Sequence, residues 1–130
     1  MDKSSKKILI IEDDQFLREF YQELLQSEGY LVDVAGDGEQ GLQKAKTGGY
    51  DLVLLDIMLP KKDGVAILQD LHLSPPQNPN GSIVCLTNLG QDSIIKQCFA
   101  LGAAGYLIKS AMNPDQVLTE VNNYLQKTQK

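Results

Sequence analysis

The sequence predicts an α/β fold in which five strands alternate with five helices and form a parallel sheet between two helical layers. Short apolar runs alternate five times with segments of helical periodicity. Four of these runs are almost wholly apolar, which is typical of parallel strands covered on both faces. With 130 residues, no internal repeat and no linker, the chain has the length of one such domain.

The expected strands are short and regularly placed. One of them, Leu31–Ala35, is interrupted by Asp33, and this acid favours a strand at the edge of the sheet, where one side meets water. The strands are expected at 8–11, 31–35, 52–55, 83–86 and 106–108.

The first two expected helices carry clear end signals. Apolar residues follow i, i+3, i+4, i+7 and i+8 spacing from Leu17, and Gly29 is placed to end that helix. Asp37 with Gln40 three residues later resembles a capping box, which predicts a second helix through Lys46.

The remaining helices are marked by periodicity and by caps. A third is expected at about 65–73, and a fourth carries apolar residues at helical spacing up to Gly102. The fifth has Asn113 as N-cap, Pro114 in the first turn and Gln116 three residues past the cap.

Five such units restrict the topology. Right-handed crossovers leave few arrangements, and a flavodoxin-like three-layer sandwich with strand order 2-1-3-4-5 is the natural choice. Ligands of these sheets bind beyond the carboxyl ends of the strands. Four adjacent strand ends carry reactive residues: Glu12-Asp13-Asp14, Asp56, Thr87 and Lys109. Each alone is an ordinary loop residue, and only their joint placement indicates a shared site.

These residue types fit phosphoryl transfer. Carboxylates held close together repel one another unless a cation neutralises them, and Mg²⁺ binds carboxylate oxygens together with phosphate. Asp56 can then act as a nucleophile toward phosphorus. Lys109 would stabilise charge on the transferring oxygens, and Thr87 could donate a hydrogen bond to the attached group.

Composition narrows the other options. The net charge is -5 and no long basic run is present, so direct nucleic-acid binding is not expected. The apolar run 8–11 is too short for a signal peptide or a membrane span. Cys85 and Cys98 lie in apolar contexts and are expected to be free thiols in the cytoplasm. His72 has no partner spacing and is expected at the surface.

Several motifs together resemble the receiver domains of two-component response regulators. The resemblance covers about residues 7–125, and its order and spacing are highly specific. The motifs are Ile-Leu-Ile-Ile-Glu-Asp-Asp at 8–14, Asp-Leu-Val-Leu-Leu-Asp-Ile-Met-Leu-Pro at 51–60, Asp63-Gly64, Leu86-Thr87 and Gly-Ala-Ala-Gly-Tyr-Leu-Ile-Lys at 102–109.

The resemblance implies that Asp56 accepts the phosphoryl group. The donor would be a sensor histidine kinase or a histidine phosphotransfer protein, and the cofactor would be Mg²⁺. Asp13 resembles the direct metal ligand of the acidic pair and Glu12 its partner, which would act through water. The backbone carbonyl of Met58 would be a further ligand.

The same resemblance implies a two-state switch rather than an enzyme with turnover. Lys109 would pair with the phosphoryl group and with Asp56, Thr87 would be the switch hydroxyl and Tyr106 the switch aromatic residue. Their movement would remodel the surface of the fourth helix, fifth strand and fifth helix. This surface would control binding to a downstream protein or to a covalently linked output domain that this chain lacks.

The sequence departs from the family pattern at several positions. Asn88 follows the switch threonine, where the family usually has a small residue. Ser110 follows the lysine in place of the usual proline, so no cis peptide is assumed there. Met58 and Leu89 are apolar at positions that influence attack by water, which predicts slow self-dephosphorylation.

Three alternatives compete with this interpretation. An aspartate-nucleophile phosphatase would need a second acid where Met58 stands. A flavin or nucleotide carrier would need a glycine-rich or hydroxyl-rich loop after the first strand, where three acids stand instead. A degenerate receiver acting as a constitutive interaction domain would not need the intact acids. We expect one receiver domain over 1–130, with a flexible segment 1–6 and a core of about 7–126, either a stand-alone regulator or part of a longer protein.

Overall fold

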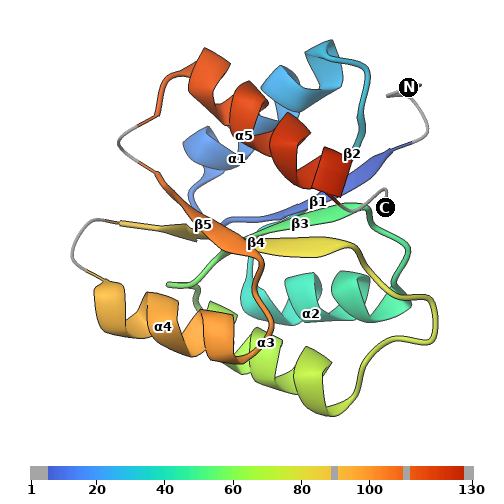
Figure 1. Cartoon of the computed structure of the whole chain (residues 1–130), viewed down its shortest axis with the longest axis vertical. Coiled ribbons are helices and arrows are strands. Elements are labelled where there is room, and N and C mark those ends of the chain that lie inside the picture. Colours follow the sequence, from blue (N-terminus) through green and yellow to red (C-terminus); the bar gives the residue numbers. More distant parts are fainter. Residues whose placement is uncertain (1–5, 89–90, 110–111, 128–130) are drawn as a thin grey trace.

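A computed structural model describes residues 6–88, 91–109 and 112–127, and the side chain of Lys127 is outside this description. Strands and helices alternate five times along the chain (Figure 1). The elements are β1 (Lys7–Ile11), α1 (Gln15–Ser27), β2 (Leu31–Ala35), α2 (Gly38–Thr47), β3 (Leu52–Asp56), α3 (Gly64–Leu73), β4 (Ser82–Thr87), α4 (Asp92–Ala100), β5 (Gly105–Ile108) and α5 (Pro114–Lys127).

The sheet has the predicted order, β2-β1-β3-β4-β5, and every neighbouring pair is parallel. Helices α1 and α5 cover one face, and α2, α3 and α4 cover the other (Figure 1). The expected flavodoxin-like three-layer sandwich is therefore confirmed. Strand β2 lies at the edge, as its central acid indicated, and Asp33 there accepts a hydrogen bond from the hydroxyl of Tyr50 at 2.7 Å.

The sheet divides the core into two apolar clusters, because successive side chains of a strand point to opposite faces. Leu9, Leu55 and Cys85 pack with α2, α3 and α4 in one cluster. Ile8 and Leu54 pack with α1 and α5 in the other. All four residues that follow Lys7 in β1 are buried, which explains why this strand is an uninterrupted apolar run.

Helix caps fix where the loops leave the sheet. The predicted N-cap of α5 is confirmed, because the backbone N–H of Gln116 donates to the Asn113 side chain at 2.9 Å. The backbone N–H of Asn113 also donates to the Gln116 side chain at 2.9 Å, which completes a reciprocal capping box. In α2, Asp37 accepts from the backbone N–H of Gln40 as predicted, but the Gln40 side chain accepts from the backbone N–H of Gly36 instead. The loop therefore closes one residue earlier than a standard box.

Cys85 and Cys98 are buried free thiols, and His72 is exposed, as the sequence indicated. Among the residues described, none of the helices has the length and apolar character that a bilayer-spanning segment needs. Residues 1–5 lie outside the described part of the chain, and so does nearly all of the segment expected to be flexible.

Candidate functional site

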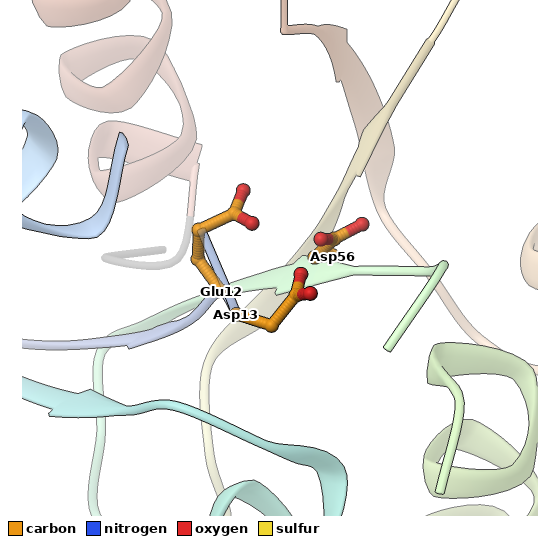
Figure 2. A group of neighbouring side chains, drawn as sticks. All are labelled: Glu12, Asp13 and Asp56. Carbon is orange, nitrogen blue, oxygen red and sulfur yellow. The ribbon is translucent and has the colours of Figure 1, made fainter. Parts of the chain in front are cut away.

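The carboxyl ends of four adjacent strands, β1, β3, β4 and β5, carry the residues that the sequence singled out. Glu12 and Asp13 follow β1, and Asp56 is the last residue of β3. Each of the three offers one carboxylate oxygen, and these oxygens lie within 4.8 Å of one another. Figure 2 shows the three side chains as neighbours at the ends of the two strands. The predicted acidic cluster is thus assembled.

The three consecutive acids after β1 have different surroundings. Glu12 is fully buried, and its Oε2 accepts a hydrogen bond from the backbone N–H of Asp14 at 3.1 Å. Asp13 is exposed. Asp14 caps α1, because its Oδ1 accepts from the backbone N–H of Leu17 at 3.1 Å. Only the first two acids therefore remain for the cluster.

Each carboxylate oxygen of Asp56, at the end of β3, accepts one hydrogen bond. The residue is 2% exposed. Its Oδ1 accepts from the backbone N–H of Met58 at 3.0 Å, and its Oδ2 accepts from Nζ of Lys109 at 3.0 Å. Gly64 lets the following loop close over this strand end, since a Cβ there would lie 2.8 Å from the carbonyl oxygen of Asp56 and 2.6 Å from Cα of Ile57.

Lys109 joins the two buried carboxylates. Its Nζ lies 2.9 Å from Oε1 of Glu12 and 3.0 Å from Oδ2 of Asp56. Oε1 of Glu12 nevertheless has no hydrogen-bond partner of suitable geometry among the described residues. One ammonium therefore faces two buried acids, with the exposed Asp13 beside them, and a buried carboxylate oxygen remains incompletely satisfied.

This arrangement shifts the pKa values of the groups involved. Burial, followed by the contact with Asp56, raises the pKa of Glu12 from 4.5 to about 7. Burial alone would lower the pKa of Lys109, but Glu12 and Asp56 outweigh it and raise that pKa above its usual value. The cluster carries more negative charge than Lys109 can balance.

A divalent cation would balance this excess of negative charge. The candidate ligands are carboxylate oxygens, which Mg²⁺ prefers. Oε1 of Glu12 lies 2.9 Å from the Lys109 ammonium but makes no hydrogen bond of suitable geometry within the described residues. Glu12, Asp13 and Asp56 could hold the ion. The backbone carbonyl of Met58, expected as a further ligand, follows Asp56 by two residues and is close in the chain.

Thr87 ends β4 and is 1% exposed. Its hydroxyl donates to Oε1 of Gln91 at 2.6 Å, with the carbonyl of Asn88 as a longer alternative at 3.1 Å. Asn88 is exposed, and its backbone N–H also donates to Oε1 of Gln91, at 2.9 Å. The predicted switch hydroxyl is therefore turned toward the start of α4.

Tyr106 and Met58 face outward. Tyr106 on β5 is 43% exposed and packs edge-on against Phe99 of α4, with 6.3 Å between ring centroids. The Met58 side chain beside the acidic cluster is 57% exposed. Two residues singled out in the sequence lie outside the described residues. They are Leu89, which is expected to influence dephosphorylation, and Ser110, which stands in place of the usual proline.

Two residues near the site were not foreseen. Nη1 of Arg18 on α1 donates to the backbone carbonyl of Glu12 at 3.0 Å, with that of Asp13 at 3.4 Å, and so holds the acidic loop. Gln91 was missed because it lies four residues past Thr87 and before the expected helix. No spacing rule singles out either residue, since both contacts depend on how a helix start folds back onto a strand end.

Comparisons with known proteins agree with this geometry. The family model for the response regulator receiver domain matches residues 8–122. A transcriptional regulatory protein, DltR of Streptococcus agalactiae, is 38% identical over 115 residues, which are 88% of this chain and 50% of the relative. The chemotaxis protein CheY of Treponema pallidum is 35% identical over 106 residues, covering 79% of this chain and 72% of the relative.

Solved structures give the same result. A CheY-like receiver domain protein from Methanospirillum hungatei has a TM-score of 0.84 at 27% identity, covering 95% of this chain and 96% of that one. The chain spans about half the length of the first curated relatives that it matches. The family model matches most of the chain, and the strand order and the acidic cluster agree with it. The chain therefore belongs to the response regulator receiver domain family.

Proposed function

We propose that this receiver domain is a phosphorylation-dependent signalling switch that accepts a phosphoryl group on Asp56 with the help of Mg²⁺. The observation that carries the proposal is the meeting of Glu12, Asp13 and Asp56 within 4.8 Å, with the Lys109 ammonium 3.0 Å from Asp56. The same four positions belong to the motifs by which the sequence resembles the family. We assign the whole chain to this single domain.

In the proposed transfer, a carboxylate oxygen of Asp56 attacks phosphorus in a phosphohistidine of a histidine kinase or phosphotransfer protein. The new O–P bond forms as the N–P bond of the donor breaks, and the departing imidazole nitrogen keeps the electron pair and takes a proton from water. Lys109 would stabilise the charge that grows on the transferring oxygens, a role supported by the 3.0 Å contact of its Nζ with Oδ2 of Asp56. Mg²⁺, when bound by Glu12, Asp13, Asp56 and the Met58 carbonyl, would neutralise these carboxylates and the phosphoryl oxygens.

The response would follow from a shift between two states. The hydroxyl of Thr87 would turn to the phosphoryl group, and Tyr106 would move inward, which would change the surface of α4, β5 and α5. The exposed Tyr106–Phe99 pair on this surface supports a role in partner contact. The partner would be a downstream protein or a linked output domain, and the buried free thiols support a cytoplasmic location.

Intact-mass spectrometry tests the acceptance step. The protein is incubated with Mg²⁺ and acetyl phosphate, beside an Asp56→Asn variant and an EDTA-treated sample. We expect one phosphoryl group on the wild type only. If acetyl phosphate gives no adduct and beryllofluoride with Mg²⁺ also leaves the NMR spectrum unchanged, the proposal is wrong, and a constitutive interaction domain becomes the better account.

We further propose that the phosphorylated form is long-lived. The exposed Met58 side chain beside Asp56 offers no polar group to orient an attacking water. After rapid removal of acetyl phosphate, the mass adduct should decay over many minutes to hours. A half-life of seconds would contradict this proposal. Met58→Gln, which supplies a polar amide of similar reach, should shorten the lifetime.

A further inference from the structure

The side chain of Gln91 makes an unusual pair of contacts at the start of α4. It occupies the N-cap position, yet it makes no hydrogen bond to the backbone N–H groups of its own helix. Its Oε1 instead turns back toward β4 and accepts two hydrogen bonds. One comes from the hydroxyl of Thr87 at 2.6 Å and one from the backbone N–H of Asn88 at 2.9 Å.

The first of these contacts uses the single proton of the Thr87 hydroxyl. A hydroxyl group has one O–H, and the 2.6 Å contact to Gln91 is shorter than the 3.1 Å contact to the Asn88 carbonyl. Thr87 is 1% exposed, so water does not compete freely for this bond. To donate to a phosphoryl group on Asp56, the hydroxyl must first leave Gln91.

We propose that Gln91 is a positioning residue that holds the Thr87 hydroxyl in the unphosphorylated orientation and so sets how readily the domain switches. This inference rests on the proposed phosphoryl-accepting function of Asp56. The carboxamide stabilises one of the two states only, and a contact present in one state shifts the equilibrium by its own free energy. Because Gln91 directly precedes α4, its side chain also links the Thr87 hydroxyl to the start of this helix. The surface of α4 is part of the region that is expected to change on phosphorylation.

Removal of this contact should make the switched state easier to reach. A neutral hydrogen bond contributes a modest net free energy, so the beryllofluoride concentration for half-saturation should fall about two- to tenfold in Gln91→Ala. Beryllofluoride with Mg²⁺ is the probe, because it binds a phosphoacceptor carboxylate as a phosphoryl analogue. Binding is followed by two-dimensional ¹H–¹⁵N NMR. The matched control is Gln97→Ala, an exposed glutamine on the same helix, which should behave as wild type.

The same substitution in a Thr87→Val variant distinguishes a role of Gln91 in positioning the hydroxyl from a role in the stability of α4. In Thr87→Val the hydroxyl is absent, so adding Gln91→Ala should produce no further change in the beryllofluoride midpoint. A role of Gln91 in α4 stability alone would persist in this background. The Mg²⁺ affinity of the unmodified protein should be the same in wild type and Gln91→Ala, because Gln91 contacts none of the three carboxylates through any described hydrogen bond.

The outcomes distinguish two failures. If the wild type does not bind beryllofluoride, the proposed function itself is wrong. If the wild type binds it and Gln91→Ala has an unchanged or higher midpoint, the inference about Gln91 is wrong while the function stands. A lowered midpoint that persists with Thr87→Val also overturns the inference, since Gln91 would then act without the hydroxyl.

Discussion

Three consecutive acids at the end of β1 have different roles because each meets a different environment. Glu12 is buried against Lys109, Asp13 is exposed beside Asp56, and Asp14 caps α1 through the backbone N–H of Leu17. Adjacent residues of the same charge are therefore expected to respond differently to the same substitution.

Asp13→Ala and Asp14→Ala form a matched pair that tests this division. Asp14→Ala should lower the free energy of unfolding by about 1 kcal/mol, the usual cost of losing an N-cap, with little change in Mg²⁺ affinity. Asp13→Ala should weaken Mg²⁺ binding at least tenfold and leave metal-free stability nearly unchanged. Urea denaturation and Mg²⁺ titration measure the two quantities. Equal effects of both variants on Mg²⁺ binding would contradict the assignment.

Glu12 makes the stability of the metal-free domain depend on pH. A carboxyl whose pKa is raised from 4.5 to about 7 binds its proton more tightly in the folded state. It therefore stabilises the fold below about pH 4.5, and this contribution is lost as pH rises to about 7. The lowered pKa values of Asp33, Asp37 and Asp70, whose usual value is 3.8, act in the opposite direction but below this window.

In EDTA, the free energy of unfolding should thus fall by up to about 3 kcal/mol between pH 4.5 and 7.5. Mg²⁺ should restore part of it above pH 6, because the ion binds the ionised carboxylates. Glu12→Gln, which cannot titrate, should flatten the EDTA curve. Urea denaturation at several pH values is the measurement, and stability that rises through this window would show that the Glu12 assignment is wrong.

The loop between β3 and α3 positions Asp56 by close approach of backbone to backbone. The backbone N–H of Gly64 donates to the carbonyl of Ile57 at 3.1 Å, while Asp63 caps α3 by accepting from the backbone N–H of Ala66. A Cβ on Gly64 would meet backbone atoms at 2.6 and 2.8 Å, and neither can move independently of the strand end.

Gly64→Ala should therefore destabilise the domain by about 1–3 kcal/mol and weaken Mg²⁺ binding together with it. Gly36→Ala is the comparison with a mobile neighbour and should be less destabilising, because its Cβ would meet only the Arg18 side chain, with Nη1 at 3.2 Å. That Nη1 also donates to the Glu12 carbonyl, so a small effect on Mg²⁺ binding is expected from this variant too. Thermal denaturation and Mg²⁺ titration provide the readouts. Wild-type metal affinity in Gly64→Ala would indicate that this close approach does not position Asp56.

The elements show what the sequence could predict. The five strands and the five helices lie where the apolar periodicity and the helix-capping residues predict them. These signals are local in the sequence and can be read without the fold. The Gln40 contact to Gly36 and the turn of Gln91 toward Thr87 were not predictable, since they depend on three-dimensional loop paths. The acidic cluster was predictable only because parallel strands bring their carboxyl ends to one edge. The pairing of Lys109 with Asp56 was expected from the resemblance, whereas its second contact, with Glu12, required the structure.

At the scale of the whole molecule, the sheet separates two apolar clusters and shields groups that would otherwise react. Cys85 of β4 is fully buried and Cys98 of α4 is 1% exposed, and both belong to the cluster under α2, α3 and α4. Burial raises the pKa of both thiols and so reduces their reactive thiolate form.

Both thiols should therefore react with a thiol reagent only when the domain opens. In native buffer, labelling by an excess of 5,5′-dithiobis(2-nitrobenzoate) should be slow and should follow the unfolding rate, whereas in denaturant both should label at once. Mg²⁺ should slow labelling further by stabilising the folded state. Rapid labelling of either cysteine in the native protein would contradict the packing of α4 on β4.

Asp56 is the carboxylate proposed to receive the phosphoryl group, among three that lie within 4.8 Å of one another. The most direct measurement is to phosphorylate the protein with acetyl phosphate and Mg²⁺, reduce the acyl phosphate with borohydride, and locate the reduced residue by tandem mass spectrometry. We predict homoserine at position 56, with Glu12 and Asp13 unmodified. Reduction at either of those acids, with Asp56 intact, would show that Asp56 is not the phosphoryl acceptor.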